Sequence, residues 1–98
     1  MKVKIQSIHF DADEKLLNFV EEKVGKLNTF SNAIIDGEVF LRLDKSSSAE
    51  NKIAEIKLLI PGNDLFAKRQ CKTFEEATDQ AIEALRRQLK KQKEKSMP

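Results

Sequence analysis

Tryptophan and tyrosine are both absent from this 98-residue sequence, which also has one cysteine, Cys71, and one histidine, His9. A lone cysteine excludes an internal disulfide and a cysteine-rich metal site. The missing aromatic types weaken the case for a platform on which nucleic-acid bases stack. The sequence also lacks a glycine-rich phosphate loop, a His-Glu-x-x-His helix and a Gly-x-Ser-x-Gly turn. We therefore expect no enzyme, no cofactor, no metal and no small-molecule substrate.

Long apolar runs are missing as well. No segment approaches the roughly 20 apolar residues that cross a bilayer, and the first ten residues lack the apolar stretch of a secretory signal. We therefore expect a cytoplasmic protein with no membrane partner. Apolar residues make up 40% of the chain and charged residues 35%, which is typical of one highly charged globular domain. We assign residues 1–95 to that domain and residues 96–98 to a short tail.

The longest regular pattern lies between Thr73 and Lys95 and predicts one helix. Thr73 and Glu76 have the spacing of a capping box, and no glycine or proline follows in the segment. Apolar and small residues recur at intervals of three and four, which places them on one helix face. This stripe consists of Phe74, Ala77, Thr78, Ala81, Ile82, Leu85 and Leu89. Because the stripe stops there, we expect the last turns to leave the body of the domain.

Charge is segregated along this predicted helix. Its first half is acidic, whereas residues 84–98 contain six basic residues and one acidic residue. The basic residues are Arg86, Arg87, Lys90, Lys91, Lys93 and Lys95. Bases at the end of a helix complement its dipole, but that effect acts only over the last turn. Two interpretations stay open, a solvated helix face and a surface that binds a polyanion such as nucleic acid.

The remaining residues predict one more helix and four strands. A helix opens near Asp11, which has the spacing of a capping box with Glu14, and ends near Asn28. Alternating apolar residues predict strands at 2–10, 34–44, 53–60 and 65–71, a tight turn at 61–64 and a mobile hairpin tip at 45–51. The order β-α-β-β-β-α indicates an α+β two-layer sandwich, in which a four-stranded sheet carries both helices on one face.

Two lysines of the first predicted helix bear on the polyanion hypothesis. Lys23 and Lys26 lie on its later turns, so they extend the basic stripe if the two helices lie side by side. Basic side chains of this kind contact phosphates, which fix position rather than read sequence. Folded RNA presents phosphates in a defined shape that proteins recognise.

Exposed apolar residues on the sheet support a second hypothesis. Phe40, Leu59 and Phe66 alternate with inward-facing residues, so we place them on the outer face of the sheet. Exposed apolar patches mark interfaces. The alternative function is therefore a protein–protein adaptor that uses this face.

His9 and Cys71 are the two isolated residues with reactive side chains. We expect His9 to be structural or exposed to solvent. The nearby cations Lys68, Arg69 and Lys72 favour a lowered pKa for Cys71. With no second cysteine or partner histidine, a role as nucleophile is not expected.

Three stretches resemble the hibernation-promoting factors and ribosome-associated inhibitors of bacteria, also called sigma-54 modulation proteins. Residues 20–27, VEEKVGKL, are similar to the family's VEEKLxKL helix end. Residues 54–62, AEIKLLIPG, are similar to a family strand that runs into a Pro/Asn-Gly turn. Residues 85–95, LRRQLKKQKEK, resemble the family's LxRQLxKxKxK and form the most specific of the three matches. The resemblance covers nearly the whole chain.

The resemblance implies a fold similar to double-stranded-RNA-binding domains and a protein that enters the ribosome in stationary phase. It implies binding to the small ribosomal subunit and its ribosomal RNA, in the channel of messenger RNA and transfer RNA. Translation would be blocked there, which is ribosome hibernation. The matching positions imply RNA contacts by Arg87, Lys91, Lys93 and Lys95, with Arg86, Lys90, Lys23 and Lys26 as additions.

The chain also departs from the family pattern. Where the family has DMYAAID before the last helix, residues 73–79 are TFEEATD, so Glu75 stands at the tyrosine position. A contact specific to that tyrosine is therefore not carried over. The sequence has neither the long acidic tail nor the second domain found in other members, so it resembles a short form.

Overall fold

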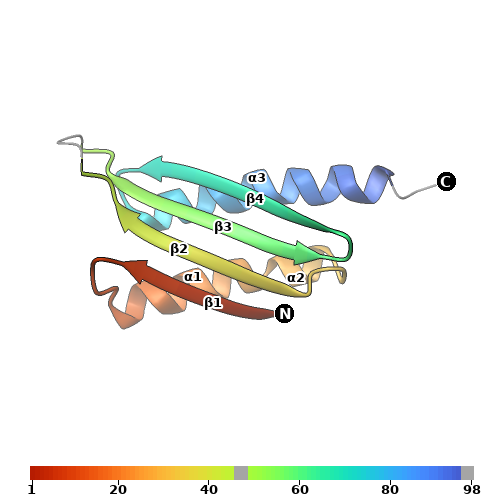
Figure 1. The fold of residues 1–98 in the computed structure, drawn as a ribbon, viewed down its shortest axis with the longest axis horizontal. Coiled ribbons are helices and arrows are strands. Elements are labelled where there is room, and N and C mark those ends of the chain that lie inside the picture. The colour runs from red at the N-terminus through yellow and green to blue at the C-terminus, as the bar shows by residue number, and fades with distance from the viewer. Residues whose placement is uncertain (46–48, 96–98) are drawn as a thin grey trace.

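The computed structural model describes residues 1–45 and 49–95, with side chains as far as residue 92. The predicted hairpin tip at 45–51 lies partly, and the predicted tail at 96–98 wholly, outside the described residues. The strands are β1 (Lys2–Ile8), β2 (Asp36–Leu43), β3 (Lys52–Ile60) and β4 (Asn63–Cys71) (Figure 1). The helices are α1 (Glu14–Gly25), α2 (Leu27–Phe30) and α3 (Phe74–Lys95).

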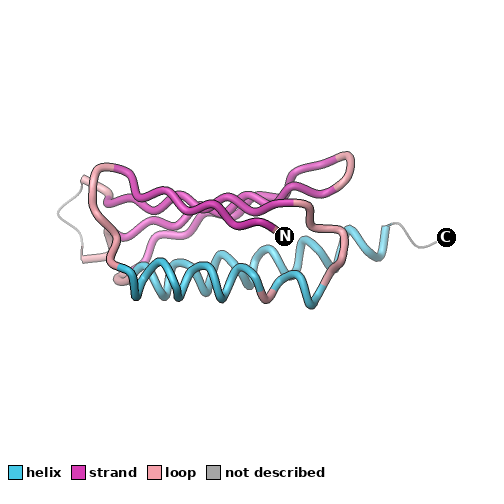
Figure 2. Tube along the Cα trace, turned by 90° about the horizontal axis from the view of Figure 1, so that it is seen from below, coloured by secondary structure: helices cyan, strands magenta, loops and turns pink. Residues whose placement is uncertain are grey.

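The four strands form one sheet in the order β1-β2-β3-β4. β2, β3 and β4 form an antiparallel meander, whereas β1 runs parallel to β2. The parallel pair follows from α1, because a strand reaches a parallel neighbour only through a crossover connection. α1 and α3 cover the same face of the sheet (Figure 2). The predicted two-layer α+β sandwich is therefore confirmed.

The hairpin between β3 and β4 closes through Pro61 and Gly62, within the predicted turn. Gly62 has a φ of 77°, in the left-handed region that glycine enters without a steric penalty. Ile60 pairs with Asn63 across the turn. β4 therefore begins two residues before the predicted strand start, because so tight a turn extends the ladder up to its ends.

α3 begins and packs as the sequence predicts. The Thr73 Oγ1 accepts a hydrogen bond of 3.0 Å from the backbone N–H of Glu76. The apolar stripe is buried along its length, apart from the half-buried Ile82. Farther along, the Nε2 group of Gln88 donates to the carbonyl oxygen of Phe66 in β4 at 2.9 Å. This bond fixes α3 against the edge strand β4. It therefore also fixes how the basic last turns of α3 are oriented relative to the sheet.

α1 differs from the prediction at both ends. Its N-cap is Asp13, whose carboxylate accepts from the N–H of Leu16 at 2.8 Å, and not Asp11. The chain turns at His9, which has a φ of 62°, and then crosses from the sheet layer to the helix layer, so Asp11 lies in the connection. α1 ends at Gly25, and the separate short helix α2 continues to Phe30. The single helix predicted to end near Asn28 is therefore two helices.

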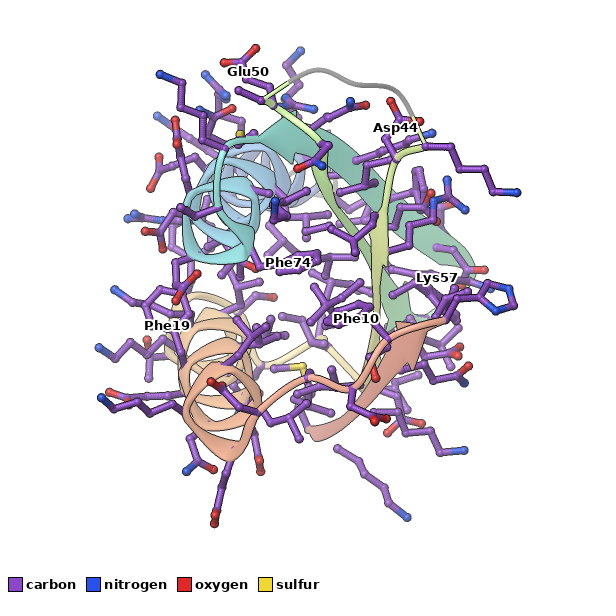
Figure 3. The ribbon with its side chains drawn as sticks, turned by 90° about the vertical axis from the view of Figure 1, so that its left-hand side faces the viewer. Phe10, Phe19, Asp44, Glu50, Lys57 and Phe74 are labelled. Atoms are coloured by element: carbon purple, nitrogen blue, oxygen red, sulfur yellow. The ribbon has the colours of Figure 1, made fainter. Side chains whose placement is uncertain are left out.

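The core lies between the inner face of the sheet and the two long helices. Leu41, Ile56 and Leu85 are fully buried in it, as is Val24 of α1. One end of the core is closed by Phe10 and Phe74, whose stacked rings have centroids 4.9 Å apart (Figure 3). One continuous core therefore positions both helices relative to each other.

The outer face of the sheet meets the sequence-based expectation only in part. Phe66 and Leu59 are 50% and 41% exposed, as expected. Phe40 is half-buried, and its cross-strand partners are Gln6 of β1 and Glu55 of β3. Leu43 follows the alternation of the buried Val39 and Leu41, yet it is 45% exposed because β2 ends there.

Candidate nucleic-acid interface

The described basic residues of α3 lie on two flanks of the helix. Arg86 and Lys90 are one turn apart, and so are Arg87 and Lys91. Arg86 lines a groove that faces α1 and α2, whereas Arg87 lines a hollow that faces β4. All four side chains are exposed. α3 therefore presents positive charge on both sides.

The end of α1 extends the flank of Arg86. Lys23 and Lys26 line the same groove, as expected from the sequence for helices that lie side by side. The ammonium group of Lys23 lies 5.5 Å from the ring centroid of Phe19, and Lys26 forms an exposed ion pair of 3.7 Å with Glu22. Surface ion pairs contribute only about 0–1 kcal/mol, and cation–π contacts at exposed sites about 0.5–1 kcal/mol. Both ammonium groups can therefore exchange these contacts for a phosphate.

Arg86 is oriented by two neighbours. Its Nη1 atom donates to Glu83 Oε1 at 2.9 Å, and its guanidinium carbon lies 5.7 Å from the ring centroid of Phe30. The contact with α2 turns the guanidinium toward the groove. A planar guanidinium in a fixed orientation suits phosphate, because its donors match two oxygens at once.

Arg87 faces a residue that sequence reasoning did not assign to the site. Arg69 of β4 lines the same hollow, together with the exposed Asp79 and Glu83. Arg69 lies two residues from the buried Ala67 and two from the buried Cys71 in β4. Its Cβ atom therefore points to the same face of the sheet as theirs, the face that the helices cover. A charged residue at an inward position of an edge strand was the signal for this placement.

Phe30 was also missed. The helix predicted from the sequence ended near Asn28, two residues short of Phe30, which in the structure ends α2 and lines the groove with Thr29. Its position four residues after Lys26 was the available signal, because that spacing places two residues on one helix face.

Two of the eight predicted contact residues extend past the described side chains. Lys93 and Lys95 belong to α3, which reaches Lys95, but their side chains lie outside the described part of the chain. The last buried residue of the stripe is Leu89, and the final turns project beyond the sheet (Figures 1 and 2). The backbone thus carries both lysines onto this projecting end.

The opposite end of the helix layer is acidic. α1 and α3 begin at the same end of the molecule (Figure 2). The exposed acids there are Asp11, Asp13, Glu14, Glu75 and Glu76. Because both helices run in the same direction, the layer has an acidic end and a basic end. A polyanion is attracted to one end and repelled by the other.

Cys71 does not have the environment of a reactive thiol. Cys71 is buried, and burial raises the pKa of its thiol; Glu76 and Glu50 add to this shift and outweigh the opposing effect of Arg69. The lowered pKa expected from nearby cations is therefore wrong. Within residues 1–45 and 49–95, no three His, Cys, Asp or Glu side chains are placed to hold a metal ion. No described helix is both long and apolar enough to cross a membrane.

Known proteins share this sequence over most of its length. The chain is 30% identical to a ribosome hibernation promoting factor of Pseudomonas putida over 95 residues, which covers 97% of this chain and 89% of that protein. It is also 30% identical to a ribosome hibernation promotion factor of Deinococcus radiodurans over 88 residues. That match covers 89% of this chain and 46% of the Deinococcus protein, so the chain spans about half of its length.

Solved structures share the fold. A ribosomal subunit interface protein from Coxiella burnetii superposes with a TM-score of 0.84 at 19% identity, covering 95% of this chain and 98% of that one. The N-terminal domain of Thermus thermophilus Protein Y gives a TM-score of 0.74 at 22% identity, with coverages of 92% and 93%. The family model for sigma 54 modulation protein / S30EA ribosomal protein matches residues 3–97. The family resemblance seen in the sequence is therefore confirmed: the chain belongs to the sigma 54 modulation protein / S30EA ribosomal protein family.

Proposed function

We propose that this protein binds the ribosome and inhibits translation during ribosome hibernation. The observation that carries the proposal is the convergence of Lys23 and Lys26 with Arg86 along one groove. Family membership supports the same function, because relatives with 30% identity are ribosome hibernation factors. Such factors act by binding, so the protein is not an enzyme.

The proposed partner is the small ribosomal subunit, through its ribosomal RNA. Lysine and arginine side chains on both flanks of α3 contact phosphates, which position the domain without reading sequence. The proposed RNA-binding residues are Lys23, Lys26, Arg86, Arg87, Lys90, Lys91, Lys93 and Lys95. The acidic end of the helix layer points away from the RNA, because phosphates repel it.

The proposed mechanism is steric. The domain occupies the channel of messenger RNA and transfer RNA on the small subunit, in the cytoplasm and in stationary phase. One continuous core holds the two long helices on one face of the sheet. Occupancy of the channel by this folded domain excludes the translation substrates, and no chemical step is needed.

Sucrose-gradient co-sedimentation with bacterial ribosomes tests the proposal. We expect the native chain to travel with the small subunit or the whole ribosome at low salt. We expect release as salt rises, because the logarithm of the affinity falls by about 0.7–0.9 per neutralised phosphate for each unit of log salt. Native protein that stays at the top of the gradient at every salt concentration contradicts the proposal.

Charge reversal identifies the surface. In the test variant, Glu replaces Arg87, Lys91 and Lys93, which lie off the buried stripe, so the fold is kept while ribosome binding is lost. The matched control replaces the exposed Lys15, Lys45 and Lys72 by Glu, which changes net charge equally but away from the basic end. Equal loss of binding in both variants points to overall charge. Unchanged co-sedimentation of the test variant rejects the flank of Arg87 and Lys91 and the projecting end of α3 as ribosome contacts.

The exposed pair Leu59 and Phe66 favours a second candidate, the protein–protein adaptor. A largely apolar interface responds little to salt, so salt dependence separates the two functions. Substitution of Leu59 and Phe66 by Ser tests the adaptor directly, since it abolishes capture of an apolar partner and leaves ribosome binding intact. A free double-stranded-RNA binder is distinguished by equal affinity for naked duplex RNA and for ribosomes.

A further inference from the structure

The groove between α1, α2 and α3 has a chemistry that phosphate binding alone does not require. Its volume is about 460 Å³, within the range of small-ligand sites. Leu27, Phe30 and Ile82 give it an apolar floor. Asp79 and Glu83 line it as well, and carboxylates repel phosphate. The site therefore suits a ligand with an apolar plane, hydrogen-bond donors and a nearby negative charge.

Arg86 and Phe30 form the planar part of this groove. The guanidinium carbon lies over the ring at 5.7 Å from the centroid, and Glu83 holds the guanidinium at 2.9 Å. About half of the Arg86 side chain, 51%, stays exposed. The guanidinium therefore lies within cation–π range of the aromatic ring and keeps an exposed part that lines the groove. Proteins stack unpaired RNA bases on both kinds of plane.

We propose that this groove holds one unstacked base of single-stranded RNA, an inference that rests on the proposed function and specifies the ligand at that surface. The base stacks on the exposed side of the Arg86 guanidinium, which Phe30 backs. Asp79 and Glu83 accept hydrogen bonds from amino groups on the base edge. Lys23 and Lys26 neutralise the flanking phosphates. Duplex RNA cannot supply this ligand, because its bases remain paired and stacked.

A cycle of protein and RNA changes tests the proposal by fluorescence anisotropy. The probes are a labelled single-stranded RNA of about ten nucleotides, within the usual site size for single-strand binders, and the same chain with abasic residues, which keeps the phosphates. Arg86→Lys keeps the charge and removes the plane. We expect it to weaken binding to the intact RNA about 5- to 10-fold, at the low end of the range for one stacked base, and to leave the abasic chain unaffected.

Two further variants make the result specific. Arg87→Lys is the matched control, because it makes the same change one residue away on the other flank, and it should affect both RNAs equally. Phe30→Leu keeps an apolar floor without an aromatic ring, and it should reproduce the effect of Arg86→Lys. Thermal unfolding by circular dichroism confirms that each variant is folded. If Arg86→Lys and Phe30→Leu are both folded and both lose affinity only for the intact RNA, the result supports a base site in the groove.

Several outcomes overturn the inference. If Arg86→Lys weakens binding to the intact and the abasic RNA equally, Arg86 contacts only phosphate. The same conclusion follows if the substitution weakens binding to neither RNA. Undetectable binding of the intact RNA by the native chain rejects the base site. Loss of ribosome binding in Phe30→Leu without any effect on the RNA probes indicates a protein segment in the groove.

The two proposals fail separately. If the native protein co-sediments with ribosomes but the effect of Arg86→Lys does not depend on the RNA base, the proposed function stands and the base site is rejected. If the effect of Arg86→Lys depends on the RNA base but the native protein does not co-sediment with ribosomes, the base site stands and the proposed function is rejected.

Discussion

Thr78 provides a sharp test of how α3 packs against the sheet. Its side chain is 0% exposed, and its Oγ1 atom has no hydrogen-bond partner among the described residues. A hydroxyl buried without a partner costs about 1–3 kcal/mol in protein mutational data. Valine has a similar shape and a similar helix propensity. Thr78→Val therefore removes the polar cost and keeps the packing.

The expected gain is about 1 kcal/mol or more in the free energy of unfolding. For a domain of this size, each 1 kcal/mol corresponds to a rise in Tm of about 4–8 °C. Thr78→Ser is the matched control, because it keeps the hydroxyl and loses a methyl group. That variant should lose about 1 kcal/mol, the contribution of one buried methyl.

Far-UV circular dichroism during heating and urea titration measures both variants, since the chain has no tryptophan for fluorescence. An unchanged urea m value assigns the difference to stability rather than to compactness. Ribosome co-sedimentation should not change, because Thr78 faces the core. A Thr78→Val protein less stable than the native chain refutes the reasoning. It would mean that the hydroxyl has a partner, such as the carbonyl of Phe74 one turn earlier.

Three further perturbations follow from the structure. Thr73→Ala removes the cap on the N–H of Glu76 and should lower the free energy of unfolding by about 1 kcal/mol in urea titration. His9→Val places a β-branched residue at a φ of 62° and should destabilise the fold by about 1–2 kcal/mol, whereas His9→Gly should be tolerated; equal melting temperatures would contradict that backbone assignment. Burial raises the pKa of Cys71, so the folded state keeps its thiol proton to higher pH than the unfolded state. Stability should therefore be full below the ordinary thiol pKa and fall as pH rises through the raised value, and Cys71→Ala should lack this part of the alkaline loss.

Local patterns in the sequence determined the elements and their buried faces. The spacing of apolar residues from Phe74 to Leu89 predicted the buried stripe of α3, because side chains three and four apart share a helix face. Thr73 predicted the helix start, since its hydroxyl bonds the N–H of Glu76 within one turn. Pro61 and Gly62 predicted the hairpin turn for an equally local reason.

Choices between nearby residues were decided by longer-range geometry. The spacing to Glu14 predicted Asp11 as the cap of α1, whereas the chain turns at His9 and α1 is capped by Asp13. Phe40 was predicted to be exposed, whereas it is half-buried between Gln6 of β1 and the half-buried Glu55 of β3. Neither outcome can be predicted from a short segment of the sequence.

The sequence by itself determined that positive charge gathers at the end of the last helix, because that charge lies within a few consecutive turns. Only the tertiary structure decided where that charge faces. Packing on one core brought the end of α1 beside Arg86, and β4 placed Arg69 beside Arg87. The ring of Phe30 reached Arg86 by the same packing. These contacts join segments far apart in the chain, and they exist only because the apolar faces of sheet and helices bury one another.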